Sequence, residues 1–217
     1  MNLLILGASG ATGQLVLAEA LRRGHTVTAL VRETAQIGTA DGAEVARGDV
    51  GDPAVLAPLL AGKDAVISCL GIGRKNAASP WSALTSPPDF TETSARVIAS
   101  AMEAAGVARI VALSAGGAGD SHAACHPILR GLFRISKLGI TIADSTRMED
   151  VYRQSALDWL AVRPARLVDG PATGKAAVVS TCGPAEKIPR ADLANWLLDA
   201  VERPERFSPN AEMVALR

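Results

Sequence analysis

Short apolar runs alternate with longer amphipathic patterns along the chain. The runs at 3–6, 26–31 and 64–70 are rich in Leu, Ile and Val, and each ends at a glycine or a charged residue, which is typical of buried parallel strands. The segments at 14–23 and 91–105 carry apolar residues at helical spacing, and a glycine follows each one directly. This alternation predicts repeated strand–helix–strand units and hence an α/β fold.

Weaker patterns complete the expected sheet and its helices. Further strands are expected at 43–47, 107–113, 158–162, 176–180 and 213–216, and further helices at 52–62, 144–154 and 190–201. We therefore expect one Rossmann-like domain over residues 1–217, with a doubly wound parallel sheet and helices on both faces. Its substrate side is expected to be formed by about 72–90, 115–147 and 165–175.

Composition narrows the classes of function. The chain has 217 residues, 48% of them hydrophobic and 3% aromatic, so an aliphatic core is expected. Its 22 basic residues balance 22 acidic ones, which leaves no net field to attract nucleic acid or an anionic membrane. The three cysteines, Cys69, Cys125 and Cys182, are widely spaced and predict neither a disulfide framework nor structural zinc. With no export-signal pattern at the start, we expect a soluble cytoplasmic protein whose partner is a small molecule.

The sequence GASGATG at 7–13 stands between the first predicted strand and the first predicted helix, which is the context of a dinucleotide-binding loop. Glycines allow a tight turn, a close approach of the pyrophosphate and close packing of the helix, whose free N–H groups then face the anion. The alternative is a helix start with small residues for packing alone. The predicted contacts to the dinucleotide are Gly7, Ser9, Gly10, Ala11, Thr12 and Gly13.

The end of the second strand indicates which dinucleotide binds. An acid about 20 residues after the glycines would bind an NAD ribose, whereas this strand ends in Arg32, whose guanidinium suits the 2′-phosphate of NADP. The adjacent Glu33 weakens this argument, and the alternative is an exposed strand-end arginine. Asp49 and Val50 follow the third strand and are expected beside the adenine, although Asp49 could simply end the strand. The predicted cofactor is NADP(H).

Several motifs together resemble the atypical short-chain dehydrogenase/reductases. They are GASGATG at 7–13, LVR at 30–32, GDV at 48–50, RM at 147–148, LDW at 157–159, RPA at 163–165 and IPRADLA at 188–194. More narrowly, the chain resembles the NAD(P)H-binding branch that holds NmrA-like proteins and flavin reductase, also called biliverdin-IXβ reductase. The resemblance covers nearly the whole chain. The glycine motif is specific to the superfamily, and the later motifs are shared by members with different activities.

The resemblance implies roles for four further places in the chain. The run Cys69-Leu70-Gly71 would pass along the adenine ribose toward the nicotinamide, and Ser114 would face the nicotinamide and the substrate. The run Pro164-Ala165-Arg166 would close over the nicotinamide, and Arg147 would line the substrate pocket. Flavin-reductase-like members carry a histidine at the position of Ala165, so this chain departs from them there.

A proton donor is harder to identify. The Tyr-x-x-x-Lys pair of the superfamily is missing, because the only tyrosine is Tyr152 and Ala156 stands four residues later. We expect Tyr152 to serve packing. Ser114 is the candidate catalytic residue and could orient a substrate carbonyl, but as an unassisted hydroxyl it is a poor acid. Its alternative role is that of a small polar residue that ends a strand.

Two histidines and a basic segment are also candidates for function. His122 and His126 bracket Cys125 and could donate protons or bind a metal, but no acidic partner has suitable spacing, so no metal site is expected. Basic residues interleave with apolar ones over 127–137 and predict an amphipathic helix. We expect this helix to be a lid with a solvated face rather than a membrane or nucleic-acid contact.

The leading hypothesis for function is an NADPH-dependent reductase of a flavin, a quinone or a small carbonyl compound. Flavins and quinones can take their proton from water once hydride has arrived, so a site without a tyrosine acid can reduce them. The alternative is a non-catalytic NADP(H)-sensing regulator that binds a partner protein, as the NmrA-like resemblance allows. Nucleotide-sugar chemistry is disfavoured, because such relatives keep Tyr and Lys and have a larger carboxy-terminal lobe.

Overall fold

The structure is a computed structural model and describes residues 1–38 and 40–217. Within these ranges the strands are β1 (Asn2–Leu6), β2 (Thr26–Val31), β3 (Glu44–Arg47), β4 (Ala65–Ser68), β5 (Arg109–Leu113), β6 (Asp158–Pro164), β7 (Arg166–Val168), β8 (Ala176–Val178), β9 (Lys187–Pro189) and β10 (Ala211–Leu216). The helices in the same ranges are α1 (Ala11–Arg22), α2 (Pro53–Leu60), α3 (Phe90–Ala105), α4 (Ser121–Ala124), α5 (Pro127–Ile135), α6 (Leu138–Arg153) and α7 (Arg190–Val201).

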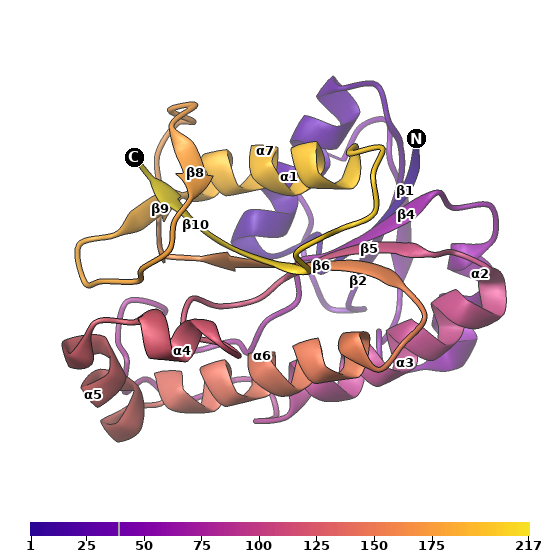
Figure 1. The fold of residues 1–217 in the computed structure, drawn as a ribbon. Helices are drawn as coiled ribbons and strands as arrows, with labels where there is room; N and C mark the ends of the chain where they lie inside the picture. The colour runs from indigo at the N-terminus through magenta and orange to yellow at the C-terminus, as the bar shows by residue number, and fades with distance from the viewer. Residues whose placement is uncertain (39) are drawn as a thin grey trace.

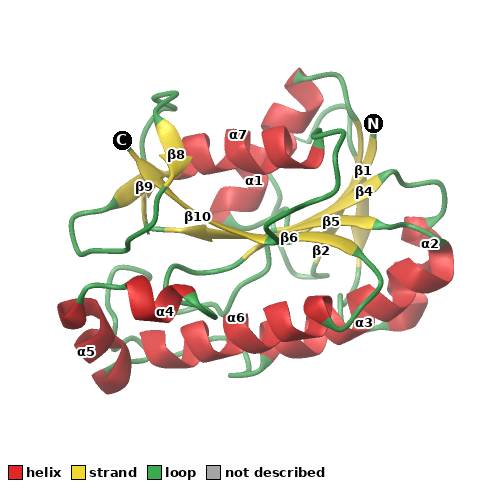
Figure 2. Cartoon of the chain, viewed as in Figure 1, coloured by secondary structure: helices red, strands yellow, loops and turns green. Residues whose placement is uncertain are grey.

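One large sheet forms the centre of the molecule, with strands in the order β3-β2-β1-β4-β5-β6-β10-β8 (Figure 1). All neighbouring strands in it are parallel except β8, which pairs antiparallel with β10 at the edge. Helices α1 and α7 cover one face of the sheet, and α2, α3 and α6 cover the other (Figure 2). The predicted single-domain, doubly wound α/β fold is therefore confirmed.

Alternation along the strands explains the two cores. Leu3 and Ile5 of β1 point to the face covered by α1 and α7, whereas Leu4 and Leu6 point to the face covered by α2 and α3. All four side chains are at most 1% exposed. Successive strand residues face opposite sides of a sheet, so a strand covered on both faces must be apolar throughout. This is why β1 and β4 were recognisable as short apolar runs.

The structure differs from the predicted elements mainly in its carboxy-terminal half. Helix α6 begins at Leu138, six residues before the predicted start. Its first turn contains Gly139, which a helical pattern disfavours. A Cβ at Gly139 would collide with the carbonyl oxygen of Phe133, so glycine lets α6 start close against α5. Strands β7 and β9 have three residues each, too few to show a pattern.

None of the helices in the described part of the chain is long and apolar enough to cross a membrane.

Candidate functional site

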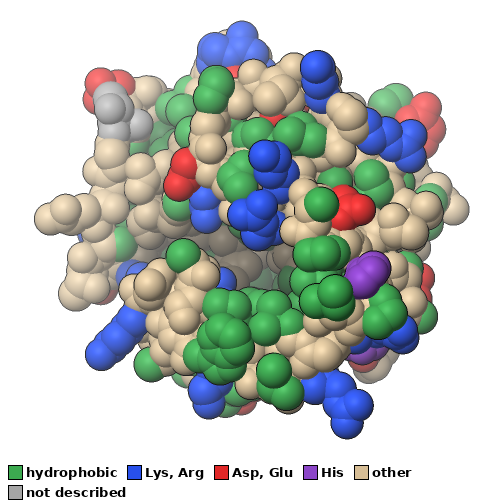
Figure 3. Space-filling model, turned by 90° about the vertical axis from the view of Figure 1, so that its left-hand side faces the viewer, with side chains coloured by type: hydrophobic (Ala, Val, Ile, Leu, Met, Phe, Trp, Pro, Cys, Tyr) green, Lys and Arg blue, Asp and Glu red, His purple; other side chains and the backbone are tan. Residues whose placement is uncertain are grey.

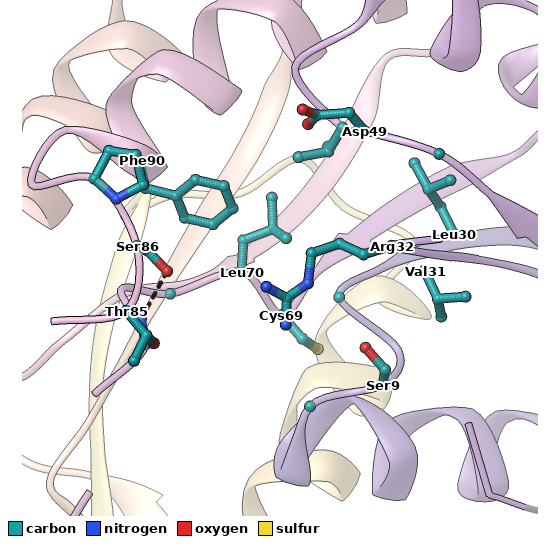
Figure 4. Close-up of a pocket in the computed structure, with 17 residues that line it drawn as sticks. Ser9, Leu30, Val31, Arg32, Asp49, Cys69, Leu70, Thr85, Ser86 and Phe90 are labelled. Atoms are coloured by element: carbon teal, nitrogen blue, oxygen red, sulfur yellow. Dashed lines mark hydrogen bonds between the residues drawn. The ribbon is translucent and has the colours of Figure 1, made fainter. Parts of the chain in front are cut away.

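The strand order reverses between β1 and β4, which are parallel neighbours: β2 and β3 extend the sheet on one side of β1, and β4, β5 and β6 extend it on the other. In open α/β sheets, ligands bind outside the carboxyl ends of the strands at such a switch point. A cavity of about 350 Å³ lies there, and the surface of this side is hollowed at its centre (Figure 3). Its lining comes from the loops that follow β1, β2, β3 and β4 (Figure 4).

The glycine loop forms one wall of this cavity, which we call the β1–β4 cavity. Gly7 turns the chain with a φ of 76°, and a Cβ at Gly13 would collide with the carbonyl of Gly7. A Cβ at Gly10 would meet only the Gly7 carbonyl oxygen, at 3.3 Å. The fold itself therefore requires glycine at Gly7 and Gly13, whereas Gly10 leaves room on the side of the cavity.

The start of α1 supplies the donors that an anion needs. The helix begins at Ala11, and Gly10 caps it without a side-chain hydrogen bond. No acceptor within residues 1–38 and 40–217 takes the backbone N–H groups of Ala11, Thr12 and Gly13. Unsatisfied N–H groups at a helix start, together with the helix dipole, form an anion site. The residues present therefore fit a pyrophosphate.

Arg32 extends from the end of β2 into the β1–β4 cavity, between Ser9 and Asp49 (Figure 4). Its guanidinium makes no ion pair with any residue that the structure describes. Asp49 follows β3 and accepts the N–H of Gly51 at one carboxylate oxygen, 2.8 Å away. The second oxygen is used by no described residue. An unpaired cation and a half-used carboxylate on one wall fit a phosphorylated ribose and an adenine amino group.

Arg47, which was not predicted as a site residue, fixes the loop that carries Arg32 through hydrogen bonds. One guanidinium nitrogen of Arg47 donates to the backbone carbonyls of Arg32, Glu33 and Ala35, at 3.4, 3.0 and 3.0 Å. These hydrogen bonds to three backbone carbonyls fix the turn after β2. A basic residue at the end of β3 gives no sign of this in the sequence, because the contact depends on the pairing of β3 with β2.

The opposite wall combines predicted and unpredicted residues. Cys69, Leu70 and Gly71 line it after β4, as the resemblance implies. Phe90 and Ser86 join them from the segment 72–90, which was expected on the substrate side only (Figure 4). The Ser86 hydroxyl accepts the N–H of Gly73 at 3.1 Å and folds this segment back on itself. Burial raises the pKa of the Cys69 thiol to about 12, so it is a neutral thiol at physiological pH.

The predicted cofactor residues fall into two groups in the structure. Those in the β1–β4 cavity are Gly7, Ser9, Gly10, Arg32, Asp49, Val50, Cys69, Leu70 and Gly71. The others lie outside its lining: Ala11, Thr12 and Gly13 in the first turn of α1, Ser114 after β5, and Pro164, Ala165 and Arg166 at the end of β6 and the start of β7.

Ser114 is not the unassisted hydroxyl that the sequence analysis assumed, and that description is wrong. Its Oγ donates to Glu149 Oε1 of α6 at 2.6 Å. Glu149 is fully buried and is paired with Arg163 of β6, with Nε to Oε1 at 2.9 Å and Nη2 to Oε2 at 2.5 Å. Arg163 also reaches the exposed Asp120, and the pKa of that carboxyl is lowered mainly by this hydrogen bond.

This Ser114–Glu149–Arg163 network could be found only in three dimensions. Its members stand on β5, α6 and β6, and an acid among polar residues of a helix looks solvent-exposed in the sequence. Both carboxylate oxygens of Glu149 accept hydrogen bonds from Arg163, and Oε1 also accepts the hydroxyl of Ser114. The proton of Ser114 is therefore directed at Glu149, and only the lone pairs of its Oγ remain.

Arg147 lies on a second cavity, of about 520 Å³, lined entirely by residues between 117 and 147. Its guanidinium is also paired with Glu92 of α3, with Nε to Oε2 at 2.5 Å. His122, Phe133 and Arg134 line the same cavity from α4 and α5. The second cavity thus falls within one of the segments expected on the substrate side.

The remaining candidates have structural partners. Tyr152 is 1% exposed and packs against the ring of Trp159, with the ring centroids 6.3 Å apart, and burial raises its pKa. His126 caps α5 by accepting the N–H of Ile128 at 3.3 Å. No group of three potential ligands that could hold a metal ion occurs among the described residues.

The chain is similar in sequence and in fold to known proteins. The model of an NAD(P)H-binding family matches residues 7–204. Among solved structures, the anaerobilin reductase ChuY of Escherichia coli O157:H7 is 24% identical, with a TM-score of 0.77 over 99% of this chain and 96% of that one. A short-chain dehydrogenase/reductase of Veillonella parvula in complex with NADP is 16% identical, with a TM-score of 0.77 over 98% and 93%.

A putative NAD-dependent epimerase/dehydratase of Bacillus halodurans is 21% identical, with a TM-score of 0.77 over 100% and 94%. These TM-scores show that the chain shares its fold with the three structures. The family match covers most of the chain and includes the glycine loop, Arg32 and the loop after β4. The chain therefore belongs to this NAD(P)H-binding family, as the motifs predicted.

Proposed function

We propose that the protein is an NADPH-dependent reductase of a planar, conjugated acceptor such as a flavin, a quinone or a linear tetrapyrrole. One observation supports this class above the others: among the described residues, the two hydroxyl groups considered as proton donors are both engaged elsewhere. Tyr152 is buried against Trp159, and the proton of Ser114 is directed at Glu149. Bound NADPH supplies hydride, and a conjugated acceptor can then take its proton from water.

The preference for NADPH over NADH depends on Arg32. Its unpaired guanidinium extends into the β1–β4 cavity, and the loop behind it is held by Arg47. A fixed cation without a carboxylate partner suits a 2′-phosphate and gains little from a ribose hydroxyl. A solved structure with the same fold was obtained in complex with NADP, which agrees with this proposal.

The second cavity supports a planar, anionic acceptor. Phe133 provides an aromatic wall, and Arg134, which has no ion pair among the described residues, provides positive charge at its edge. Gly117 begins this lining three residues after Ser114, so the cavity opens next to the loop that is expected to face the nicotinamide. A similar structure carries the name of an anaerobilin reductase, and a tetrapyrrole therefore belongs in the test.

A sensing regulator is the second candidate, and an exposed apolar patch favours it. Trp81, Ile128 and Ile135 are 60%, 66% and 70% exposed. The Trp81 indole N–H donates to the carbonyl of Ile135 at 3.2 Å, so two of the three residues are adjacent. Exposed apolar patches mark interaction sites more often than isolated apolar residues do.

One experiment separates the two functions. NADPH oxidation is followed by absorbance with FMN, a quinone, a linear tetrapyrrole and an aliphatic ketone, with the Gly10→Val variant as the control that cannot bind cofactor. We expect turnover with at least one planar acceptor and a ketone rate lower by at least about 100-fold, since general acid catalysis contributes roughly 10²–10⁴-fold. Tight NADPH binding without turnover of any acceptor would instead favour the regulator.

A further inference from the structure

Two cysteines far apart in the sequence stand opposite each other in the fold. Cys125 follows α4 and Cys182 follows β8, and the two residues form an isolated parallel bridge. The N–H of His126 donates to the carbonyl of Cys182 at 2.7 Å, and the N–H of Cys182 donates to the carbonyl of Ala124 at 3.3 Å. Strands paired in this way lie about 4.7–4.9 Å apart, inside the Cα separation of about 4.4–6.8 Å that a disulfide needs.

The side chains of this pair point to the same place. The Cys182 sulfur lies 3.3 Å from the position that a Cβ on Gly116 would take, and the Cys125 sulfur lies 3.4 Å from the corresponding position on Gly117. Cys182 lowers the pKa of Cys125 and Cys125 raises that of Cys182, so the two thiols lie close to each other. Both belong to a small apolar cluster with Phe133 and others, and both are free thiols. Backbone spacing and side-chain direction therefore both permit a bond.

We propose that Cys125 and Cys182 are an oxidation-sensitive dithiol that closes to a disulfide with a small disulfide such as oxidised glutathione. The bond would fix the α4–α5 segment (residues 121–135) to the chain after β8, across the Gly116–Gly117 turn that follows Ser114. Nothing in the proposed reductase function requires these thiols, so the inference goes beyond it.

The reaction balances as thiol–disulfide exchange. The thiolate of one cysteine attacks a sulfur of the oxidised glutathione and releases one glutathione thiol. The second cysteine then attacks the protein sulfur of this mixed disulfide and releases the other glutathione. The two protein thiols lose two electrons and two protons, and the oxidant takes up both as two free thiols.

The environment of the pair makes closure slow in the resting protein. Burial raises the pKa of Cys125 and raises that of Cys182 to about 12. The charged groups that face the pair oppose each other, since Arg130 of α5 lowers the pKa of Cys125 and Glu186 raises that of Cys182. Because the thiolate is the attacking species, the pair stays reduced unless oxidant is in excess or the α4–α5 segment opens.

The test is disulfide mapping of the full-length protein. Reduced protein is incubated with excess oxidised glutathione, the remaining thiols are alkylated under denaturing conditions, and peptides are identified by mass spectrometry. We expect loss of two alkylatable thiols, a peptide linking Cys125 to Cys182, and alkylated Cys69. A disulfide that includes Cys69, glutathione adducts without an internal bond, or three alkylated cysteines would each overturn the proposal.

Matched variants and a structural readout complete the test. Cys182→Ser should abolish the internal bond and Cys69→Ser should leave it unchanged; the wild-type map decides if the first variant fails to fold. Hydrogen exchange across residues 121–135 should be slower in the oxidised protein than in the reduced one. Equal exchange would show that the bond does not fix this segment. Neither readout requires NADPH turnover, so failure here is distinguishable from failure of the proposed reductase function.

Discussion

The β1–β4 cavity and the region beyond β5 are the two halves of the ligand-binding side, and they differ in whether their polar groups are hydrogen-bonded within the protein. In the β1–β4 cavity, the N–H groups at the start of α1, the guanidinium of Arg32 and one oxygen of Asp49 have no partner among the described residues. Beyond β5, Ser114, Glu149 and Arg163 are bonded to one another. Arg147 is likewise paired with Glu92.

This difference indicates that a ligand supplies hydrogen-bond partners in the first half only. N–H groups and a cation that are left unpaired around one cavity can bind a charged ligand directly, so the first half suits a dinucleotide. The paired groups of the second half hold β5, α6 and β6 together. Under the proposed function, the first half binds the cofactor and the second half forms a wall of the acceptor site.

The largest expected effect breaks the first half alone. Gly10→Val should abolish NADPH binding in a folded protein, because its side chain would occupy the space of the pyrophosphate while the backbone at φ −74° and ψ 161° accepts a β-branched residue. Calorimetric titration and circular dichroism check the two parts. Gly13→Val is the matched variant and should instead fail to fold, since its Cβ would collide with the Gly7 carbonyl. Normal NADPH binding by folded Gly10→Val would place the phosphate elsewhere.

The next effect breaks the second half. Glu149→Ala leaves the buried guanidinium of Arg163 with only the exposed Asp120, and should destabilise the fold by about 3–5 kcal/mol. Asp120→Ala, which removes the exposed partner, should cost less than about 1 kcal/mol. Urea unfolding of both variants measures the difference. Equal losses of unfolding free energy in the two variants would show that the buried pair contributes no more to stability than the exposed one.

A smaller effect sharpens cofactor choice. Losing a charge-assisted phosphate contact costs about 1.5–3 kcal/mol, so Arg32→Ala should weaken NADPH binding by about 10- to 150-fold and leave NADH binding unchanged. Arg206→Ala, at an exposed site after α7, is the control and should alter neither affinity. Equal losses for NADPH and NADH in Arg32→Ala would contradict the assignment.

The smallest effect concerns Ser114. Because its proton is directed at Glu149, Ser114→Ala should lower kcat/KM with a quinone or flavin by less than about 100-fold, closer to the loss of one or two neutral hydrogen bonds at roughly 0.5–1.5 kcal/mol each. Steady-state kinetics with saturating NADPH measure this. A greater loss, or rapid reduction of an aliphatic ketone by the wild type, would reveal an unrecognised proton donor.

The cofactor half was largely predictable from the sequence, because its information is local. The GASGATG loop, Arg32 and Asp49 each follow a strand whose apolar run is evident, and the carboxyl ends of parallel strands meet at one edge. Phe90, the first residue of α3, was missed as a lining residue because the loop before it, which carries it to the cavity, leaves no periodic signal.

The other half was poorly predictable for the opposite reason. The bond between Ser114 and Glu149 joins residues 35 positions apart, and Arg163 reaches Glu149 because α6 packs against β6. The Cys125–Cys182 contact likewise depends on where two short segments meet. Glu149 of α6 would be expected at the surface from the sequence, but it is buried and paired with Arg163 of β6.

The most direct test of the cofactor assignment is a pair of calorimetric titrations of the wild-type protein, one with NADPH and one with NADH, at the same ionic strength. The unpaired Arg32 predicts that NADPH binds at least about 10-fold more tightly, the lower limit for one charge-assisted phosphate contact. Equal affinities, or tighter binding of NADH, would contradict it.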